Sequence, residues 1–238
     1  MSGFQCKQFY VSHDRCGMKV GTDSLLLGSW VDLSRVQRVL DIGTGSGILA
    51  LMMAQRLADD GLTDYQIDGV EIEPEAAEQA ASNFAASPWQ HCLSAQLADI
   101  HQWRPQHQYD LVISNPPYFS AGQQLPCKKR QQARLEQTLS MTSLLSIAAA
   151  MVTADGQIAL VLPLERRVDV ALWAAQAGWY IDQQLTIKGR ADKAAKRVLL
   201  SLRQGLGETL YYELTIYDQN NQYSQAFRQL TKAFYLAF

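Results

Sequence analysis

The feature that most constrains the fold is an apolar run that ends in three glycines spaced two residues apart. Residues 38–42 are typical of a short strand, and residues 48–57 are dense in Leu, Met and Ala, as in a helix. Between them lie Gly43, Gly45 and Gly47. Glycines at such a junction let the backbone approach a ligand closely. The sequence therefore predicts a strand, a glycine turn and a helix that together form part of a binding site.

Strand-like and helix-like segments alternate along the rest of the chain. The segments expected as strands are 38–42, 67–71, 92–97, 109–114, 157–162, 179–187, 198–203 and 210–217. The segments expected as helices are 48–57, a stretch that begins at Pro74 and is closed by Ser87-Pro88, 143–152, 168–177 and an aromatic stretch near the C-terminus. This alternation implies a doubly wound α/β fold, in which helices cover both faces of a mostly parallel sheet.

Composition is that of an ordinary folded protein. Of the 238 residues, 47% are hydrophobic and 18% are charged, which argues against a disordered, collagen-like or low-complexity chain. The sequence has no internal repeat and no clear linker, so we expect a single domain over residues 1–238. Its expected parts are an N-terminal element (1–35), a core (36–204) and a C-terminal strand and helix (205–238).

The cysteines and the N-terminus bear on the cellular compartment. Cys6, Cys16, Cys92 and Cys127 form no C-x-x-C pair, so neither a zinc site nor a disulfide scaffold is indicated. We therefore expect no metal and a reducing, cytoplasmic location. The N-terminus does not resemble a secretory signal, and the longest uncharged stretch, 137–154, is too rich in Ser and Thr to suggest a membrane span.

The glycine spacing separates two classes of nucleotide-binding turn. A dinucleotide fingerprint, G-x-G-x-x-G, would need a third glycine at Ile48, so this template fails. The sequence Asp41-Ile-Gly43-Thr-Gly45-Ser-Gly47 instead resembles motif I of the class I S-adenosylmethionine-dependent methyltransferases. That resemblance implies a Rossmann-like fold with one antiparallel late strand, and S-adenosylmethionine as the cofactor bound by this loop. An ordinary glycine turn is the alternative.

Two acidic residues follow the next two expected strands. Glu71 lies 24 residues beyond Gly47, close to the spacing at which a carboxylate accepts hydrogen bonds from ribose hydroxyls. Asp99 comes just after the third strand. The methyltransferase resemblance assigns Glu71 to the ribose and Asp99 to the adenine amino group of the cofactor. Either residue alone is as readily a surface carboxylate, but two at successive strand ends converge on one crevice.

The tetrapeptide Asn115-Pro116-Pro117-Tyr118 follows the fourth strand and resembles the catalytic motif of amino methyltransferases. An exocyclic amine is a poor nucleophile because its lone pair is delocalised into the ring. Acceptors on Asn115 and Pro116 would localise that pair, and two prolines would hold them rigid. Tyr118 would stack on a base swung out of its neighbours. A proline-rich turn that only ends a strand is the alternative.

The segment before the first strand offers further cofactor contacts. By resemblance to amino methyltransferases, Thr22 and Asp23 touch the amino-acid end of the cofactor, and Lys19 neutralises its carboxylate. A plain helix start capped by Thr22 or Asp23 competes with this interpretation.

Charge is distributed unevenly. The formal net charge is −2, yet residues 57–103 contain nine acids and no Lys or Arg, which leaves +7 for the remainder. The basic residues that we propose for RNA binding form two clusters, Lys128, Lys129, Arg130 and Arg134, and Lys188, Arg190, Lys193, Lys196 and Arg197. Basic surfaces suit a polyanion, although each cluster can equally be a solvated loop.

Strings at both ends of the chain narrow the substrate. Residues 9–23 and 221–236, together with the two motifs, resemble a family of bacterial tRNA (adenine-N6)-methyltransferases. The resemblance implies methylation of adenine 37 in the anticodon loop of a tRNA. Other RNA bases and a protein glutamine amide remain alternatives, as does a nucleic-acid-binding module that holds the cofactor only as a ligand; an NAD dehydrogenase is weaker still. The sequence does not determine the oligomeric state.

Overall fold

The computed structural model describes residues 2–117 and 139–238. Its main sheet contains β3 (Arg38–Ile42), β4 (Gln66–Glu71), β5 (Leu93–Leu97), β6 (Tyr109–Ser114), β7 (Val152–Pro163), β8 (Trp179–Arg190), β9 (Arg197–Gln204) and β10 (Leu210–Tyr217). The helices are α1 (Thr22–Trp30), α2 (Ile48–Asp59), α3 (Pro74–Ala85), α5 (Met141–Met151), α6 (Arg167–Ala177) and α7 (Gln225–Thr231). Two short 3-10 helices are η1 (Gln90–Cys92) and η2 (Leu164–Arg166), and β1 (Gly3–Gln5) pairs with β2 (Tyr10–Ser12) in a separate hairpin.

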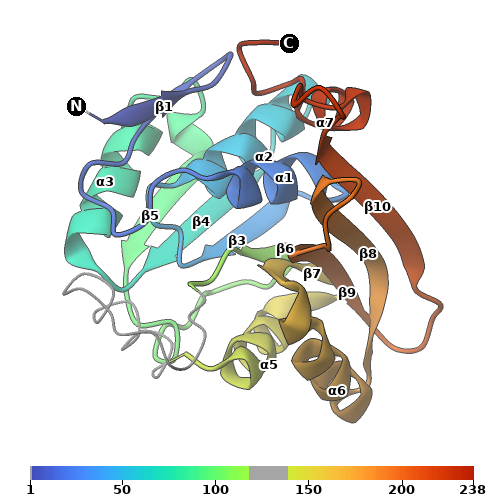
Figure 1. The fold of residues 1–238 in the computed structure, drawn as a ribbon. Helices are drawn as coiled ribbons and strands as arrows, with labels where there is room; N and C mark the ends of the chain where they lie inside the picture. Colours follow the sequence, from blue (N-terminus) through green and yellow to red (C-terminus); the bar gives the residue numbers. More distant parts are fainter. Residues whose placement is uncertain (1, 118–138) are drawn as a thin grey trace, which may run out of the picture.

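The sheet has the order β10-β8-β9-β7-β6-β3-β4-β5 (Figure 1). Strand β9 is antiparallel to both neighbours, and every other pair in the sheet is parallel. The predicted mostly parallel α/β sheet with one antiparallel late strand is therefore confirmed. Strand β10, expected in a C-terminal part of the chain, lies at the edge of the same sheet.

Both faces of the sheet are covered by apolar side chains. Val39 and Ile113 belong to the cluster that contains α1 and α2 side chains, whereas Leu40 and Val112 belong to the cluster that contains α5 and α6 side chains. Successive side chains of a strand point to opposite faces, so a strand buried on both sides is apolar throughout. This is why the sequence of β3 and β6 is nearly continuous in apolar residues.

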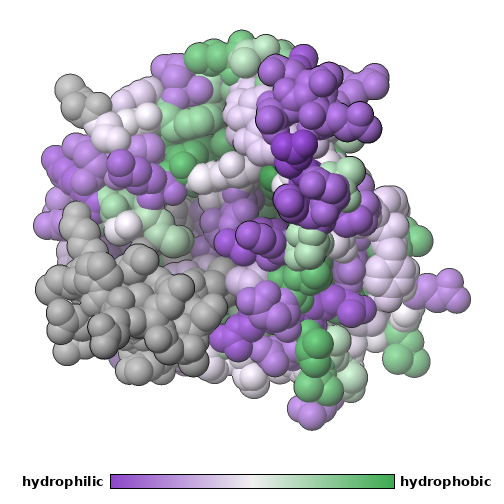
Figure 2. All heavy atoms as spheres, in the orientation of Figure 1, coloured by the Kyte–Doolittle hydropathy of each residue, from purple (hydrophilic) through white to green (hydrophobic). Residues whose placement is uncertain are grey.

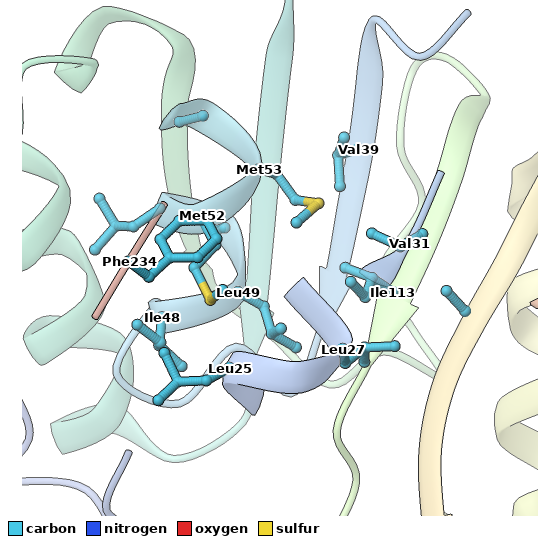
Figure 3. Packing of buried hydrophobic residues seen from close by; sticks show 14 of the residues in the cluster. Leu25, Leu27, Val31, Val39, Ile48, Leu49, Met52, Met53, Ile113 and Phe234 are labelled. Carbon is cyan, nitrogen blue, oxygen red and sulfur yellow. The ribbon is translucent and has the colours of Figure 1, made fainter. Parts of the chain in front are cut away.

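Helix α1, which precedes the main sheet in the sequence, packs against α2. A Cβ on Gly28 would lie 2.6 Å from Met52 Sδ and 3.2 Å from Met52 Cβ, so a larger residue would require Met52 to shift. Figure 3 shows Leu25 and Leu27 of α1 directed toward the side chains of α2 and the sheet, with Phe234 beside Met52. The first turn of α1 is thereby held against the core.

The structure also differs from the expectations in detail. The hairpin of β1 and β2 was not predicted, because strands of three residues leave almost no periodic signal. Strand β7 begins five residues before its expected start at Gln157, and its pairing with β6 shifts register near Tyr109. The polar segment expected over residues 120–137 lies outside the described residues.

Candidate functional site

The candidate site residues follow strands that end at one edge of the sheet. Strands β3, β4, β5 and β6 are parallel, so the loops after them share that edge. The chain passes from β3 to β4 and β5 on one side and then returns to β6 on the other, which makes the β3 end a topological switch point. Ligands of open α/β sheets bind in the crevice outside the carboxyl ends of strands at such a point.

The glycine turn lies between β3 and α2, as the sequence predicted. Gly43, Gly45 and Gly47 have φ values of +70°, +55° and +82°, which L side chains rarely adopt. A Cβ on Gly47 would lie 2.4 Å from Phe84 Cε1, whereas a Cβ on Gly43 would meet nothing within 4 Å. The backbone at Gly43 therefore faces open space that a ligand can approach.

Asp41 points beneath this turn. Its side chain is buried, and Oδ2 accepts a hydrogen bond of 2.6 Å from Thr44 Oγ1. Burial raises the pKa of the Asp41 carboxyl to about 7, opposed by the hydrogen bond from Thr44 and reinforced by the charge of Glu71. The sequence grouped Asp41 with the cofactor residues; in the structure its observed contact shapes the loop.

Glu71 fixes the other side of the loop. Its Oε2 accepts from the Gly45 amide at 2.9 Å, and its Oε1 accepts from the amides of Ile72 and Glu73 at 2.9 and 3.0 Å. A carboxylate has about four acceptor positions, so about one remains for a ligand while these bonds last. The structure brings Glu71 to the loop, as its spacing predicted, and adds the Gly45 contact that spacing did not reveal.

Asp99 lies in the turn after β5, tied to the same edge. The Ala98 amide donates to the Glu71 carbonyl at 2.9 Å, which joins this turn to the end of β4. Asp99 Oδ1 accepts from the His101 amide at 2.9 Å, and the carboxylate is half-buried. The two acids that the sequence paired are therefore neighbours along the edge.

Asn115 begins the loop after β6. Its Nδ2 donates to Ser24 Oγ in the first turn of α1, at 2.8 Å. The preceding Ser114 donates through Oγ to the Ile42 carbonyl at 2.7 Å, so the end of β6 is fastened to the residue before the glycine turn. Asn115, Pro116 and Pro117 are half-buried there, and Tyr118 lies outside the described residues.

Ser24 is the contact that sequence reasoning missed. It stands between Asp23 and an apolar run, and it is 6% exposed. Ser24 and Asn115 are 91 residues apart, so no local pattern links them. The one signal in the sequence is a polar residue directly before three leucines.

The start of α1 differs from one of the two interpretations offered for it. The helix is capped by Gly21 with no side-chain hydrogen bond, so neither Thr22 nor Asp23 is the cap. Asp23 Oδ2 instead accepts from Arg197 Nε at 2.9 Å. Lys19 and Thr22 are exposed just before and at the helix start, and the segment is anchored where the Val20 amide donates to His13 Nδ1 at 3.3 Å.

The second basic cluster comes to the same edge. Strands β7 and β8 are both antiparallel to β9, so the β8–β9 connection lies where β3 and β6 end. Figure 2 shows hydrophilic residues gathered over α7 and below it on this face.

Several members of this cluster have partners. Lys188 pairs with Glu213 at 2.8 Å, and Arg190 donates to Asn221 Oδ1 at 2.6 Å. Lys193 lies 3.5 Å from Asp192 and its side chain is 67% exposed. Lys196 precedes Arg197, whose partner is Asp23. The exposed lysines are thus better placed than Arg197 to meet a phosphate.

The remaining predictions are limited by what the structure describes. Lys128, Lys129, Arg130 and Arg134, the first basic cluster, lie outside the described residues. Within residues 2–117 and 139–238, no three His, Cys, Asp or Glu side chains are grouped so that they could hold a metal ion. In the same part of the chain, no helix is long and apolar enough to cross a membrane.

Comparisons with known proteins agree with this geometry. The family described as Methyltransferase small domain matches residues 15–172. Proteins named tRNA1(Val) (adenine(37)-N6)-methyltransferase are similar over almost the whole chain. One from Yersinia pestis (strain Pestoides F) is 46% identical over 238 residues, which cover 99% of this chain and 94% of that protein. One from Yersinia pseudotuberculosis serotype O:3 (strain YPIII) is also 46% identical, and 93% of it is covered.

Solved structures share the fold at low sequence identity. A predicted O-methyltransferase from Agrobacterium tumefaciens has a TM-score of 0.69 and 19% identity, covering 89% of this chain and 96% of that one. A putative RNA methyltransferase from Pyrococcus horikoshii has a TM-score of 0.52 and 17% identity, covering 77% of this chain and 82% of that one. These similarities show the fold of a class I methyltransferase.

Proposed function

The chain belongs to the family of tRNA1(Val) (adenine(37)-N6)-methyltransferases, and from that premise we propose that it methylates N6 of adenine 37 in the anticodon loop of tRNA1(Val). The methyl donor in this proposal is S-adenosylmethionine. The observation that supports it most is the position of Asn115, which follows β6 beside the glycine turn and has the donor end of its amide bound to Ser24.

The residues of the turn fit such a cofactor. Gly43 and Gly45 leave no side chain between the backbone and a ligand, and a Cβ on either would find at least 4.0 Å of space. We assign Glu71 to the ribose, where it retains acceptor capacity, and Asp99 to the adenine. Lys19, Thr22 and Asp23 are assigned to the amino-acid end. When bound, S-adenosylmethionine supplies an electrophilic methyl group on a sulfonium.

The chain's own residues prepare the target amine. Asn115 Oδ1 and the Pro116 carbonyl accept the two N–H groups of adenine N6, which localises its lone pair. Pro116 and Pro117 fix φ, so these acceptors need little reorganisation as positive charge develops on the amine. That charge makes the amine acidic, so no residue acting as a strong base is required. Tyr118 stacks on the extruded base.

The partner in this proposal is tRNA. We assign phosphate contacts to the exposed lysines of the β8–β9 connection and to the basic cluster that follows Tyr118. A structured RNA that presents an unpaired base can be chosen by shape. Such a substrate, together with cysteines that form no C-x-x-C pair, favours the cytoplasm.

A transfer assay distinguishes this proposal from its alternatives. The protein is incubated with radiolabelled S-adenosylmethionine in three parallel reactions. One contains purified tRNA, one contains a soluble protein fraction, and one contains no further substrate. We expect label in tRNA only. Label in the protein fraction would favour glutamine methylation, and cofactor binding without label in any fraction would favour a non-enzymatic binding module.

The Asn115→Ala variant tests the catalytic assignment in the same assay. We expect turnover to fall by roughly 10²- to 10³-fold, as on loss of an oriented polar partner of the reacting group. Cofactor affinity, measured by calorimetry, should change little because the glycine turn is untouched. Turnover close to that of the unmodified protein would contradict the role of Asn115.

A further inference from the structure

We propose that Ser24 is a positioning residue for the reaction, because its hydroxyl holds the Asn115 amide in the orientation that presents Oδ1 to the target amine. This inference rests on the proposed function and deepens it. It concerns one hydrogen bond of 2.8 Å, from Asn115 Nδ2 to Ser24 Oγ, between residues 91 positions apart.

The orientation of the amide decides whether the site can work. A side-chain amide has a carbonyl end that accepts and an NH2 end that donates. If Asn115 turned by 180°, its NH2 would face the NH2 of adenine, and two donors would be opposed. Because Ser24 engages Nδ2, the acceptor Oδ1 is directed to the other side of the group. The hydrogen bond seen in the structure therefore holds the arrangement that polarises the amine.

The position of Ser24 is itself well fixed. The side chain is 6% exposed, and the helix that carries it is packed against α2 through Gly28 and Met52. The adjacent Asp23 is paired with Arg197 of β9 at 2.9 Å. The first turn of α1 is thus held on two sides, so its hydroxyl is a stable reference for the amide.

Helix stability does not account for a serine here. Ser has a lower helix propensity than Ala, and the cap of α1 is Gly21 with no side-chain hydrogen bond. Ser24→Ala should therefore leave the helix intact and remove only the contact to Asn115. The substitution therefore tests the contact with Asn115 separately from the stability of α1.

The test compares three variants with the unmodified full-length protein in single-turnover methylation of tRNA. Ser24→Ala should slow methyl transfer about 10-fold, the effect of one lost hydrogen bond, and leave the apparent affinities for tRNA and S-adenosylmethionine within about twofold. Ser24→Thr keeps a hydroxyl and should restore the rate to within about threefold. Ser29→Ala is the matched control on the same helix, because within the described residues the buried Ser29 hydroxyl has no hydrogen-bond partner.

A double-variant cycle distinguishes positioning from a general structural effect. If Ser24 acts through Asn115, Ser24→Ala should cause no further loss of rate in the Asn115→Ala background. A full 10-fold loss there would overturn the proposal, and so would an Ala variant as fast as the unmodified protein or a Thr variant as slow as the Ala variant. If the unmodified protein methylates no RNA, the proposed function fails as well, whereas an active protein insensitive to Ser24→Ala overturns the positioning role alone.

Discussion

Gly47 illustrates how one residue can be indispensable for two reasons. Its φ is +82°, and a Cβ there would lie 2.4 Å from Phe84 Cε1, whereas Gly61 has the same φ and nothing within 4 Å. We expect Gly61→Ala to lower the free energy of unfolding by about 1–2 kcal/mol, from backbone strain alone. Gly47→Ala adds overpacking against a buried ring, for about 2–5 kcal/mol in all. Urea unfolding of both variants measures the difference, and equal losses would contradict the contact.

Asp41 gives the protein a pH dependence of predictable sign. Its carboxyl has an ordinary pKa of 3.8, which burial raises to about 7 in the folded state. Between these values the folded protein holds a proton that the unfolded chain releases, so the stability contributed by this group is full below about pH 4 and is lost as the pH rises toward about 7. Over this pH range we expect the free energy of unfolding of the unmodified protein to fall by at most about 4 kcal/mol more than that of the Asp41→Asn variant.

Urea unfolding of the unmodified protein and the Asp41→Asn variant at several pH values measures that difference. Parallel pH profiles for the two proteins would show that Asp41 titrates normally. The hydrogen bond from Thr44 lowers the pKa of the Asp41 carboxyl, but the larger effect of burial raises it, so the sign is unchanged.

Single site residues could be identified in the sequence by their place after strands, but their contacts with distant segments could not. Glu71 and Asn115 could be selected because each follows a strand of a recognisable pattern. The pairing of Glu71 with the Gly45 amide and of Asn115 with Ser24 depends on how loops and α1 fold back over the edge. No local pattern encodes those distances.

Among the elements, the β8–β9 connection is the one most open to a test of RNA contact. Lys193 and Lys196 are both exposed, whereas Arg197 is paired with Asp23. We expect the Lys193→Ala, Lys196→Ala double variant to weaken tRNA binding. The slope of log affinity against log salt should also fall, by about 1 for each phosphate that a lysine no longer neutralises.

Arg197→Ala is the comparison for that double variant. It removes one positive charge from the same connection, but its partner is a carboxylate of α1. Filter binding over a series of salt concentrations should show a smaller change of slope than the lysine variant shows. A reduction of slope as large as that of the lysine variant would place Arg197 on the RNA.

Three strands of the main sheet were predicted with their observed bounds, whereas the three-residue strands β1 and β2 were not predicted and β7 was predicted too short. The expected strands at 38–42, 109–114 and 210–217 have the observed bounds, because their apolar runs are flanked by clear turns. The sequence proposed the second basic cluster for RNA binding from its charge alone, and its place at this edge of the sheet depends on β9 running antiparallel to its neighbours. Strand direction follows from the pairing of the whole sheet and leaves little trace in one segment.

For the whole molecule, the uneven charge of the sequence becomes a spatial polarity. The acidic stretch from 57 to 103 includes α3, β4 and β5, at one end of the sheet, and the second basic cluster lies between β8 and β9, near the other end. Figure 1 shows these two ends on opposite sides of the central strands. A polyanion is therefore expected to approach over β7 to β9 and present its base to Asn115 from that side.

Segments near the two ends of the chain contact each other on the face of the sheet that α1 and α2 cover. The Lys7 amide donates to the Phe234 carbonyl at 3.1 Å, and the rings of Phe9 and Phe234 lie 6.5 Å apart. Phe234 is buried in the same core cluster as α1 and α2. The N-terminal segment that leads to Lys19 and Thr22 is therefore supported by the C-terminal segment, a relation that neither terminal sequence predicts alone.

The central claim is that an amide oxygen after β6 and a methyl donor on the glycine turn meet at one exocyclic amine of one tRNA. Nucleoside mass mapping tests it most directly, using an unmodified tRNA1(Val) transcript incubated with the protein and isotopically labelled S-adenosylmethionine. We predict labelled N6-methyladenosine at position 37, and none in a transcript with guanine there. Label at another position or on another atom, or labelling that survives the guanine replacement, would contradict the account.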